Sequence, residues 1–356
     1  MRAAAIVEPY FRARTHVRTN AMSMPREDGA LRRVLGWPSA GALERLPIIC
    51  AHCDAVFTPS DLDYGCLRER FKSETLRDAF VPLERDDETN AFLISSRKKS
   101  TWTHERRARR CTELRRTMSL TEANAVIGRG KMFVFSESHV ETLLAGTGCG
   151  REWALDVGAG CGDVTSRLAA KVDKVCATES SPGMVARLRE KEFKAVLESD
   201  TVEGVVERVR AMGHQDLPCD GFDVVSALNL VDRVDSPTAL LRDLRAAVNK
   251  TTGVVILAIV VPFRPFVERA DGTRGKPSEF VDAPSTGSWE TGVESLWANL
   301  IKPSGFDLLK LSRVPYISEG DHKFGAYVLD DAVFVLRPTR AASDVPKVND
   351  ASETVV

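Results

Sequence analysis

An alternation of short apolar segments with helical segments dominates the middle of the chain, and it constrains the fold most. Helical spacing lies between the segments, as at Val164, Leu168 and Val172. The last apolar segment is uninterrupted over 254–261, which is typical of a central strand covered on both faces. This order predicts a doubly wound α/β sheet with strands at 153–157, 174–179, 193–197, 223–229 and 253–261.

The balance of charge argues against a nucleic-acid partner. Lys and Arg number 49 against 50 Asp and Glu, whereas duplex-binding proteins usually carry a clear basic excess. Residues 97–116 hold nine basic and two acidic groups, but such a run is more often a solvated helix face, and Trp102 alone makes a poor stacking platform. The longest apolar run, eight residues, is far below the roughly 20 that a membrane span needs. We therefore expect a protein without nucleic acid and without a membrane span.

The eight cysteines are too sparse for a disulfide scaffold, which favours reduced thiols in an intracellular, most simply cytoplasmic, protein. Cys50, His52, Cys53 and Cys66 offer part of a zinc site, but a second close pair of ligands is missing. We therefore expect no metal. Five arginines in the first 26 residues keep organellar targeting open as an alternative.

Glycines alternate directly after the first predicted strand, at Gly158, Gly160 and Gly162. Without a Cβ atom, such a loop bends sharply and lets a ligand approach the backbone closely. The spacing lacks the later glycine of the dinucleotide-binding fingerprint. By itself the loop is a weak indication of a cofactor.

Two acids sharpen the interpretation of this loop. Asp156 ends the first strand, where a carboxylate can hold an ammonium directly or through water, and Glu179 ends the second, where an acid can accept both hydrogen bonds of a ribose diol. A ligand with a cationic amino-acid end and an adenosine end meets both groups. The residues therefore predict S-adenosylmethionine as cofactor and S-adenosylhomocysteine as its product.

Several blocks along the chain resemble a known family. The runs 155–165 and 177–179 resemble class I S-adenosylmethionine-dependent methyltransferases in general. Further blocks are more specific and resemble the DREV family, over about residues 80 to 338 in total. These further blocks lie at 87–93, 128–136, 228–233, 262–268, 276–279, 315–321 and 327–335. The resemblance implies a Rossmann-like sheet, mostly parallel with a C-terminal antiparallel strand, plus an N-terminal helical extension.

The resemblance also implies an activity, because the best-known DREV member is a protein-histidine N-methyltransferase. The implied reaction methylates the Nπ (pros) nitrogen of histidine in His-x-His segments of protein substrates, where x is small. A neutral imidazole is nucleophilic near pH 7. The enzyme's task is then to position the ring and to choose which nitrogen attacks.

Family position assigns roles to individual residues. Asp232 is the expected catalytic carboxylate, which accepts a hydrogen bond from Nτ–H of the target ring, although a helix cap or a salt bridge to Arg233 is the alternative. Nearby Asp235 competes for this role but better fits a cap of the helix after Pro237. The other assigned residues are Asn229 and Tyr316 for the cofactor, with Tyr327, Arg129 and either Phe133 or Phe135 for the substrate.

Two departures from the family pattern stand out. Cys161 occupies a loop position that usually holds an acid, and the segment 200–221, normally near the adenine, is longer than usual.

The sequence divides into four regions. Residues 1–75 form a poorly matched, flexible N-terminal region, and residues 76–145 a helical extension with a lid. Residues 146–338 form the methyltransferase domain, and residues 339–356 a disordered tail. A monomer is expected.

Three other functions stay open from the sequence. A small-molecule imidazole or dipeptide methyltransferase uses the same chemistry on a free compound. A cofactor-binding pseudoenzyme is suggested by Cys161 in the loop. A nucleic-acid methyltransferase is least favoured, because the chain lacks an Asn-Pro-Pro-Tyr type of motif.

Overall fold

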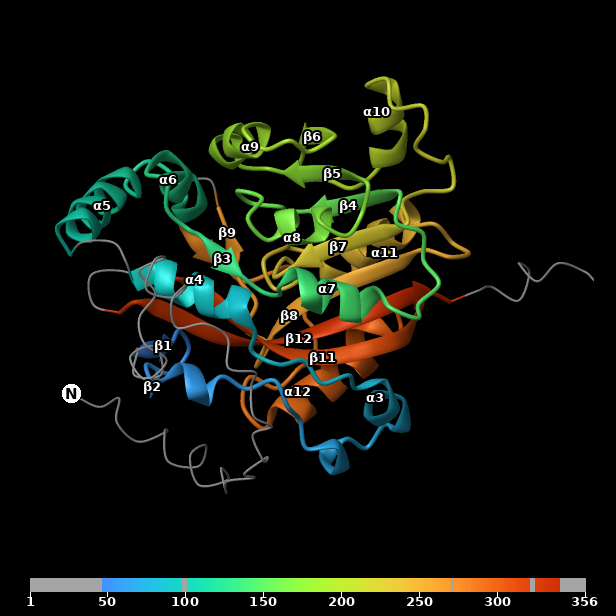
Figure 1. Cartoon of the computed structure of the whole chain (residues 1–356), viewed down its shortest axis with the longest axis horizontal. Helices are drawn as coiled ribbons and strands as arrows, with labels where there is room; N and C mark the ends of the chain where they lie inside the picture. The colour runs from blue at the N-terminus through green and yellow to red at the C-terminus, as the bar shows by residue number, and fades with distance from the viewer. Residues whose placement is uncertain (1–46, 98–100, 270–271, 321–323, 340–356) are drawn as a thin grey trace, which may run out of the picture.

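One mixed sheet runs through the part of the chain that the computed structural model describes, residues 47–97, 101–269, 272–320 and 324–339 (Figure 1). Along its main path the strand order is β2-β1-β12-β8-β7-β4-β5-β6. Strand β12 (Ala326–Pro338) is antiparallel to both β8 and β11 (Phe306–Glu319). The parallel strands are β4 (Trp153–Val157), β5 (Lys174–Glu179), β6 (Ala195–Glu198), β7 (Val224–Leu228) and β8 (Val254–Val261). The predicted fold class is confirmed.

Apolar cores lie on both faces of this sheet, and β8 contributes to each in turn. Val255, Leu257 and Ile259 enter one core, while residues 254, 256 and 258 enter the other. Alternation of this kind follows from the two-residue period of a strand. The first core is covered by α10 (Val205–Ala211), α11 (Pro237–Ala247), α12 (Trp289–Leu296) and η3 (Trp297–Ile301), and the second by α7 (Glu137–Leu144) and α8 (Thr165–Ala169).

The element boundaries near the glycine loop follow local sequence rules. Helix α9 (Pro182–Arg189) begins at the predicted proline, and the Ser181 hydroxyl accepts a hydrogen bond from the Met184 amide. The helix after the loop is shorter than the apolar spacing predicted: α8 covers five residues. The third strand begins at Ala195, two residues later than expected.

The segment before the glycine loop packs onto the sheet. Strand β1 (Ile48–Cys50) pairs in parallel with β12, and the Val81 amide donates to the Leu311 carbonyl of β11. The tail beyond Thr339 and the arginine-rich first 26 residues lie outside the described residues. The other elements are β2 (Val56–Phe57), η1 (Pro59–Asp61), η2 (Arg68–Arg70), α3 (Glu74–Ala79), α4 (Asp87–Arg97), α5 (Thr101–Leu114), α6 (Leu120–Val126), β3 (Met132–Phe133), β9 (Val267–Glu268) and β10 (Arg274–Gly275).

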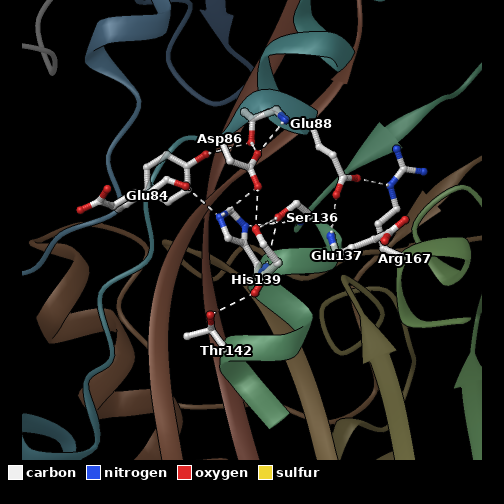
Figure 2. A network of polar contacts seen from close by, with 11 residues as sticks. Glu84, Asp86, Glu88, Ser136, Glu137, His139, Thr142 and Arg167 are labelled. Atoms are coloured by element: carbon white, nitrogen blue, oxygen red, sulfur yellow. Dashed lines mark hydrogen bonds and ion pairs between the residues drawn. The ribbon is translucent and has the colours of Figure 1, made fainter. Parts of the chain in front are cut away.

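A polar network fastens α4 to α7 and α8 (Figure 2). The buried His139 ring uses Nε2 for the Glu84 carbonyl at 2.8 Å, and its Nδ1 lies 3.4 Å from the Ser136 amide, which donates to it. Glu88 of α4 accepts from the Glu137 amide at 2.9 Å and from Arg167 Nε of α8 at 3.3 Å. These contacts fix the extension against the helices that flank the glycine loop.

Candidate functional site

The glycine loop follows β4 at the carboxyl edge of the sheet, and all three glycines have left-handed backbones. Their φ values are 70°, 57° and 78° at Gly158, Gly160 and Gly162, a region that side chains with a Cβ rarely adopt. A Cβ on Gly162 would lie 2.8 Å from the Leu188 side chain, whereas one on Gly160 would meet nothing within 4 Å. Gly162 therefore serves helix packing, and Gly160 faces open space that a ligand can use.

Asp156 lies beneath the loop and is almost completely buried. Its two carboxylate oxygens accept from the Thr165 hydroxyl at 2.5 Å and the Ser226 hydroxyl at 2.6 Å. Burial raises its pKa to about 6, although these hydrogen bonds oppose the rise. Asp156 thus ties the loop to α8 and β7, and a direct contact with the cofactor stays a prediction.

Glu179 lies at the end of β5 and faces the glycine loop. Its Oε2 accepts from the Gly160 amide, and its Oε1 accepts from the amides of Ser180 and Ser181, all at 2.9 Å. The carboxylate is therefore fixed beside the open face of the loop. Oε1 also accepts from the Ser180 hydroxyl at 3.4 Å, whereas Oε2 accepts only from the Gly160 amide among the described residues, so Oε2 keeps capacity for a ribose hydroxyl.

Asn229 follows β7 with a left-handed φ of 57°, which is uncommon for a residue other than glycine and clusters at functional sites. Its amide nitrogen Nδ2 donates to Asp331 Oδ2 at 2.8 Å. Its backbone N–H donates to the Ala258 carbonyl of β8 at 2.8 Å. The side-chain oxygen Oδ1 is buried and has no hydrogen-bond partner among the described residues.

Asp232 is buried three residues further on. Its Oδ2 pairs with Arg233 Nη1 at 2.7 Å, so the predicted alternative of a salt bridge is present. Its Oδ1 is buried without a partner in the described part of the chain. Burial raises the pKa of Asp232 to about 6, against the opposing effect of Arg233. The site thus holds an acid with one oxygen fixed and the other available.

Asp331, in β12, belongs to the same cluster and was missed by the sequence reasoning. It is fully buried, and its Oδ1 also lacks a partner among the described residues. Burial raises the pKa of Asp331 well above its ordinary value, and the Asp232 charge acts in the same direction. The available signal was a pair of adjacent acids, Asp330 and Asp331, inside an apolar strand sequence. Because neighbouring strand residues face opposite ways, the two acids had to lie on different faces of the sheet.

Three buried oxygens without partners therefore gather at one place, from Asn229, Asp232 and Asp331. Unpaired buried acceptors are costly, so such a cluster needs a donor-bearing group to satisfy it. The methionine end of S-adenosylmethionine carries an ammonium with three N–H donors, and an imidazole carries one. The residues present therefore fit both groups that the sequence predicted for this edge of the sheet.

The predicted aromatic and lid residues are only partly brought to this cluster. Tyr316 of β11 lies near it: the charges of Asp331 and Asp232 add to burial in raising its pKa, and its hydroxyl donates to Met132 Sδ. Tyr327 of β12 is half-buried, with its ring centroid 6.1 Å from that of Phe324. Arg129 donates to the Gly320 carbonyl at 3.3 Å.

Phe133 does not enter the site. Its ring is 2% exposed and packs against Phe92, with centroids 5.6 Å apart. Phe135 is also fully buried, in the core beneath α7. The block at 128–136 instead supplies β3, which pairs with β11. The Phe133 side chain in this edge strand of the sheet therefore packs into the apolar core. This position contradicts the predicted contact of Phe133 with the substrate.

The structure also places Asp235 and Cys161, which the sequence analysis discussed. The helix after Pro237 is capped by Ser236, whose hydroxyl accepts from the Ala239 amide, so the cap predicted for Asp235 is wrong. Asp235 instead accepts from the Ser278 amide at 2.9 Å. The Cys161 side chain is buried in a small apolar cluster with Ala125 and Met184, between α6 and α9.

The profile of a known family matches this chain over residues 64–338, with the description DREV methyltransferase. The match covers the glycine loop, the acceptor cluster and the C-terminal strands. The chain belongs to the DREV methyltransferase family. It is thus an S-adenosylmethionine-dependent methyltransferase, and the predicted cofactor is confirmed.

Solved structures similar to this DREV methyltransferase share little sequence with it. A SAM-dependent methyltransferase from Leishmania major is 13% identical, with 82% of this chain and 97% of that chain covered at a TM-score of 0.37. The DhpI–SAH complex is 20% identical, with 70% and 99% covered and a TM-score of 0.35. A putative methyltransferase from Bacillus halodurans is 12% identical, with 57% and 100% covered and a TM-score of 0.36.

Within the described residues of the DREV protein, the helices are all too short or too polar to cross a bilayer. The same residues contain no cluster of three or more His, Cys, Asp or Glu side chains arranged to hold a metal. Cys50, Cys53 and Cys66 are free thiols.

Proposed function

We propose that this DREV methyltransferase methylates the Nπ nitrogen of histidine in His-x-His segments of protein substrates. The resemblance to methyltransferase-like protein 9, a protein-histidine methyltransferase, supplies the substrate class. The observation that carries the proposal is the buried, unpartnered Oδ1 of Asp232. An acceptor in that position is suited to the N–H of a neutral imidazole.

The cofactor is assigned to the carboxyl edge of the sheet. Gly160 offers backbone with open space above it, Glu179 is fixed beside the loop, and Asn229 presents an oxygen at the end of β7. When bound there, S-adenosylmethionine supplies a methyl group on a sulfonium, which is its own leaving group. The protein's remaining tasks are to hold the target ring in line and to control its protons.

Asp232 performs the proton control in this proposal. When its Oδ1 accepts from Nτ–H, the ring is held in the tautomer whose Nπ lone pair is free. As the new N–C bond forms at Nπ, the ring becomes an imidazolium, and the adjacent carboxylate stabilises that charge. After the product leaves the site, the methylated ring loses its Nτ proton to solvent water, which restores a neutral ring. The Arg233 guanidinium holds the other carboxylate oxygen and so limits rotation of the acid.

The decisive experiment combines two peptides and two small compounds. A His-Ala-His peptide, its Gln-Ala-Gln counterpart, free histidine and carnosine are incubated with the protein and labelled cofactor, and fragmentation locates the methyl group on the ring. We expect methylation of His-Ala-His at Nπ, none of the glutamine control, and at least tenfold slower reaction of the free compounds.

Other outcomes contradict the proposal in different ways. Preferred reaction of carnosine assigns a small-molecule substrate. A methyl group on Nτ refutes the role given to Asp232. Cofactor binding by calorimetry without methylation of any compound favours a pseudoenzyme.

A further inference from the structure

The pairing between Asn229 and Asp331 joins two parts of the sheet that are not neighbours in the strand order. Asn229 directly follows β7 and Asp331 lies within β12, with β8 between these strands. Their side chains nevertheless meet across the end of β8, with Nδ2 of Asn229 donating to Oδ2 of Asp331 at 2.8 Å. A buried acid placed to receive that one N–H is a costly feature, so it calls for a function.

The hydrogen bond fixes which end of the Asn229 amide is left without a partner. A side-chain amide has a donor end and an acceptor end. Because Nδ2 is occupied by Asp331, the buried and unpartnered Oδ1 is the end left for a ligand. The carbonyl oxygen of a neutral acid can also accept this hydrogen bond, although more weakly than a carboxylate oxygen does, so the contact can form in either protonation state of Asp331.

We infer that Asp331 is a positioning residue, which locks the Asn229 amide so that its oxygen receives the α-ammonium of S-adenosylmethionine. The inference rests on the cofactor placement of the proposed function and assigns the ligand group that Asn229 meets. An N–H-bearing cation satisfies the exposed acceptor. An amide free to turn would present its own N–H₂ to that cation and repel it.

The structure supplies a matched control one residue away. Asp330 lies on the opposite face of β12, where its carboxylate accepts from Arg313 Nη2 at 2.7 Å. Asp330 and Asp331 are therefore adjacent acids in one strand, but they lie on opposite faces and contact different partners. A change that acts through the strand as a whole affects both variants alike.

The test compares two ligands that differ in the amino-acid end. S-adenosylhomocysteine carries the α-ammonium, and 5′-methylthioadenosine lacks the whole amino-acid part. Calorimetry gives both dissociation constants for the wild type, Asp331→Val, Asp331→Asn and Asp330→Asn. Valine fits a strand well but accepts no hydrogen bond, whereas asparagine retains an oxygen that accepts from Asn229. Thermal unfolding without ligand verifies that each variant is folded.

We expect the preference of the wild type for S-adenosylhomocysteine to fall about 10- to 100-fold in Asp331→Val, the loss of a hydrogen bond to a charged group. Affinity for methylthioadenosine should change less than threefold. Asp331→Asn should recover most of the preference, and Asp330→Asn should keep all of it.

Three results overturn the inference: an unchanged preference in Asp331→Val, a parallel loss of both ligands, or an equal effect of Asp330→Asn. If Asp331→Val fails to fold, Asp331→Asn takes its place in the comparison. A full loss of the preference for S-adenosylhomocysteine in Asp331→Asn also contradicts the inference. The histidine proposal fails separately. A wild type that prefers S-adenosylhomocysteine but methylates no His-x-His peptide refutes the substrate and leaves the role of Asp331 intact.

Discussion

At the scale of single residues, Asp232→Asn is the sharpest test of the site. The variant keeps the size of the side chain but loses the charge that stabilises a developing imidazolium. Removing one such electrostatic contribution commonly lowers the rate about 10²- to 10³-fold. We expect a fall of that size in kcat on a His-Ala-His peptide, with cofactor affinity changed less than threefold.

The control for this variant is Asp235→Asn, because Asp235 lies three residues away and accepts hydrogen bonds from Ser278. Its kcat should stay within about threefold of wild type. A loss of cofactor binding in Asp232→Asn places Asp232 in the cofactor shell instead. If Asp232→Asn keeps the wild-type kcat and Asp235→Asn loses it, then Asp235 is the catalytic carboxylate and Asp232 is not.

The pH dependence follows from two groups that must both be deprotonated. Asp232 accepts a proton-bearing nitrogen best as a carboxylate, and burial raises its pKa to about 6. The substrate imidazole attacks as the neutral form, with an ordinary pKa of about 6.5. As the pH falls below about 6, both groups become protonated. We therefore expect kcat/KM to rise between pH 5.5 and 7.5 and then level off.

The slope of that profile separates the two groups. Wild-type kcat/KM should fall towards a hundredfold per pH unit at the acid end, and Asp232→Asn should fall only tenfold. Equal slopes contradict the role of Asp232. Activity that still climbs strongly above pH 8.5 indicates a lysine substrate.

Sequence reasoning placed four candidate site residues correctly along the sheet, although their roles stay predictions. Asp156 and Glu179 lie at the ends of β4 and β5, and Asn229 and Asp232 follow β7, all at the carboxyl edge. It did not foresee Asp331, because a residue in the interior of β12 reaches the site only through the order of β7, β8 and β12. It also did not foresee that hydroxyl groups occupy both oxygens of Asp156.

At the scale of elements, two glycines of one loop should respond differently to the same change. Alanine at either position has to adopt a left-handed φ, and this backbone conformation costs about 1–2 kcal/mol of folding free energy. At Gly162 the new Cβ also lies 2.8 Å from Leu188, whereas at Gly160 it faces open space. We expect Gly162→Ala to lower Tm more, and Gly160→Ala to lower cofactor affinity more. Calorimetry and thermal unfolding of both variants measure this, and the reverse pattern contradicts the loop assignment.

The link between the loop and β5 gives a second prediction at this scale. Glu179 receives the Gly160 amide at 2.9 Å and is placed to receive a ribose hydroxyl. Glu179→Ala should weaken cofactor binding by about 1.5–3 kcal/mol, the usual range for hydrogen bonds to a charged group. Glu198→Ala, in the exposed end of the neighbouring β6, is the control and should bind normally. Equal affinities for the two variants remove Glu179 from the site.

Elements with strong local signals were predictable, and those defined by distant partners were not. The strands β4 and β5 match their predicted bounds because each is a short apolar run. Strand β3 has two residues and depends on its pairing with β11. The sequence of residues 128–136 alone therefore indicated a lid over the site and no strand. Strand β1 likewise depends on β12, far along the chain.

At the scale of the whole molecule, the extension should unfold together with the sheet. Leu76 of α3 is fully buried in the core that also contains Trp153 and Phe334. Leu76→Ala should cost about 2–5 kcal/mol, as large-to-small changes in cores do. Circular dichroism and tryptophan fluorescence should report one shifted transition, while Thr75→Ala, exposed on the same helix, leaves it in place. Two separate transitions indicate an independent extension.

The adjacent acids of β12 make the chemistry of the site depend on strand register. Asp330 pairs with Arg313 on one face, and Asp331 receives Asn229 on the other. A slip of one residue between β12 and β8 would move each side chain of β12 to the other face. When Asp330 takes the register position of Asp331, it lies beside Asn229, and Leu329 then takes the position from which Asp330 pairs with Arg313. We therefore expect a single-residue insertion between Ala326 and Asp330 to impair function even where the apolar pattern of β12 tolerates it.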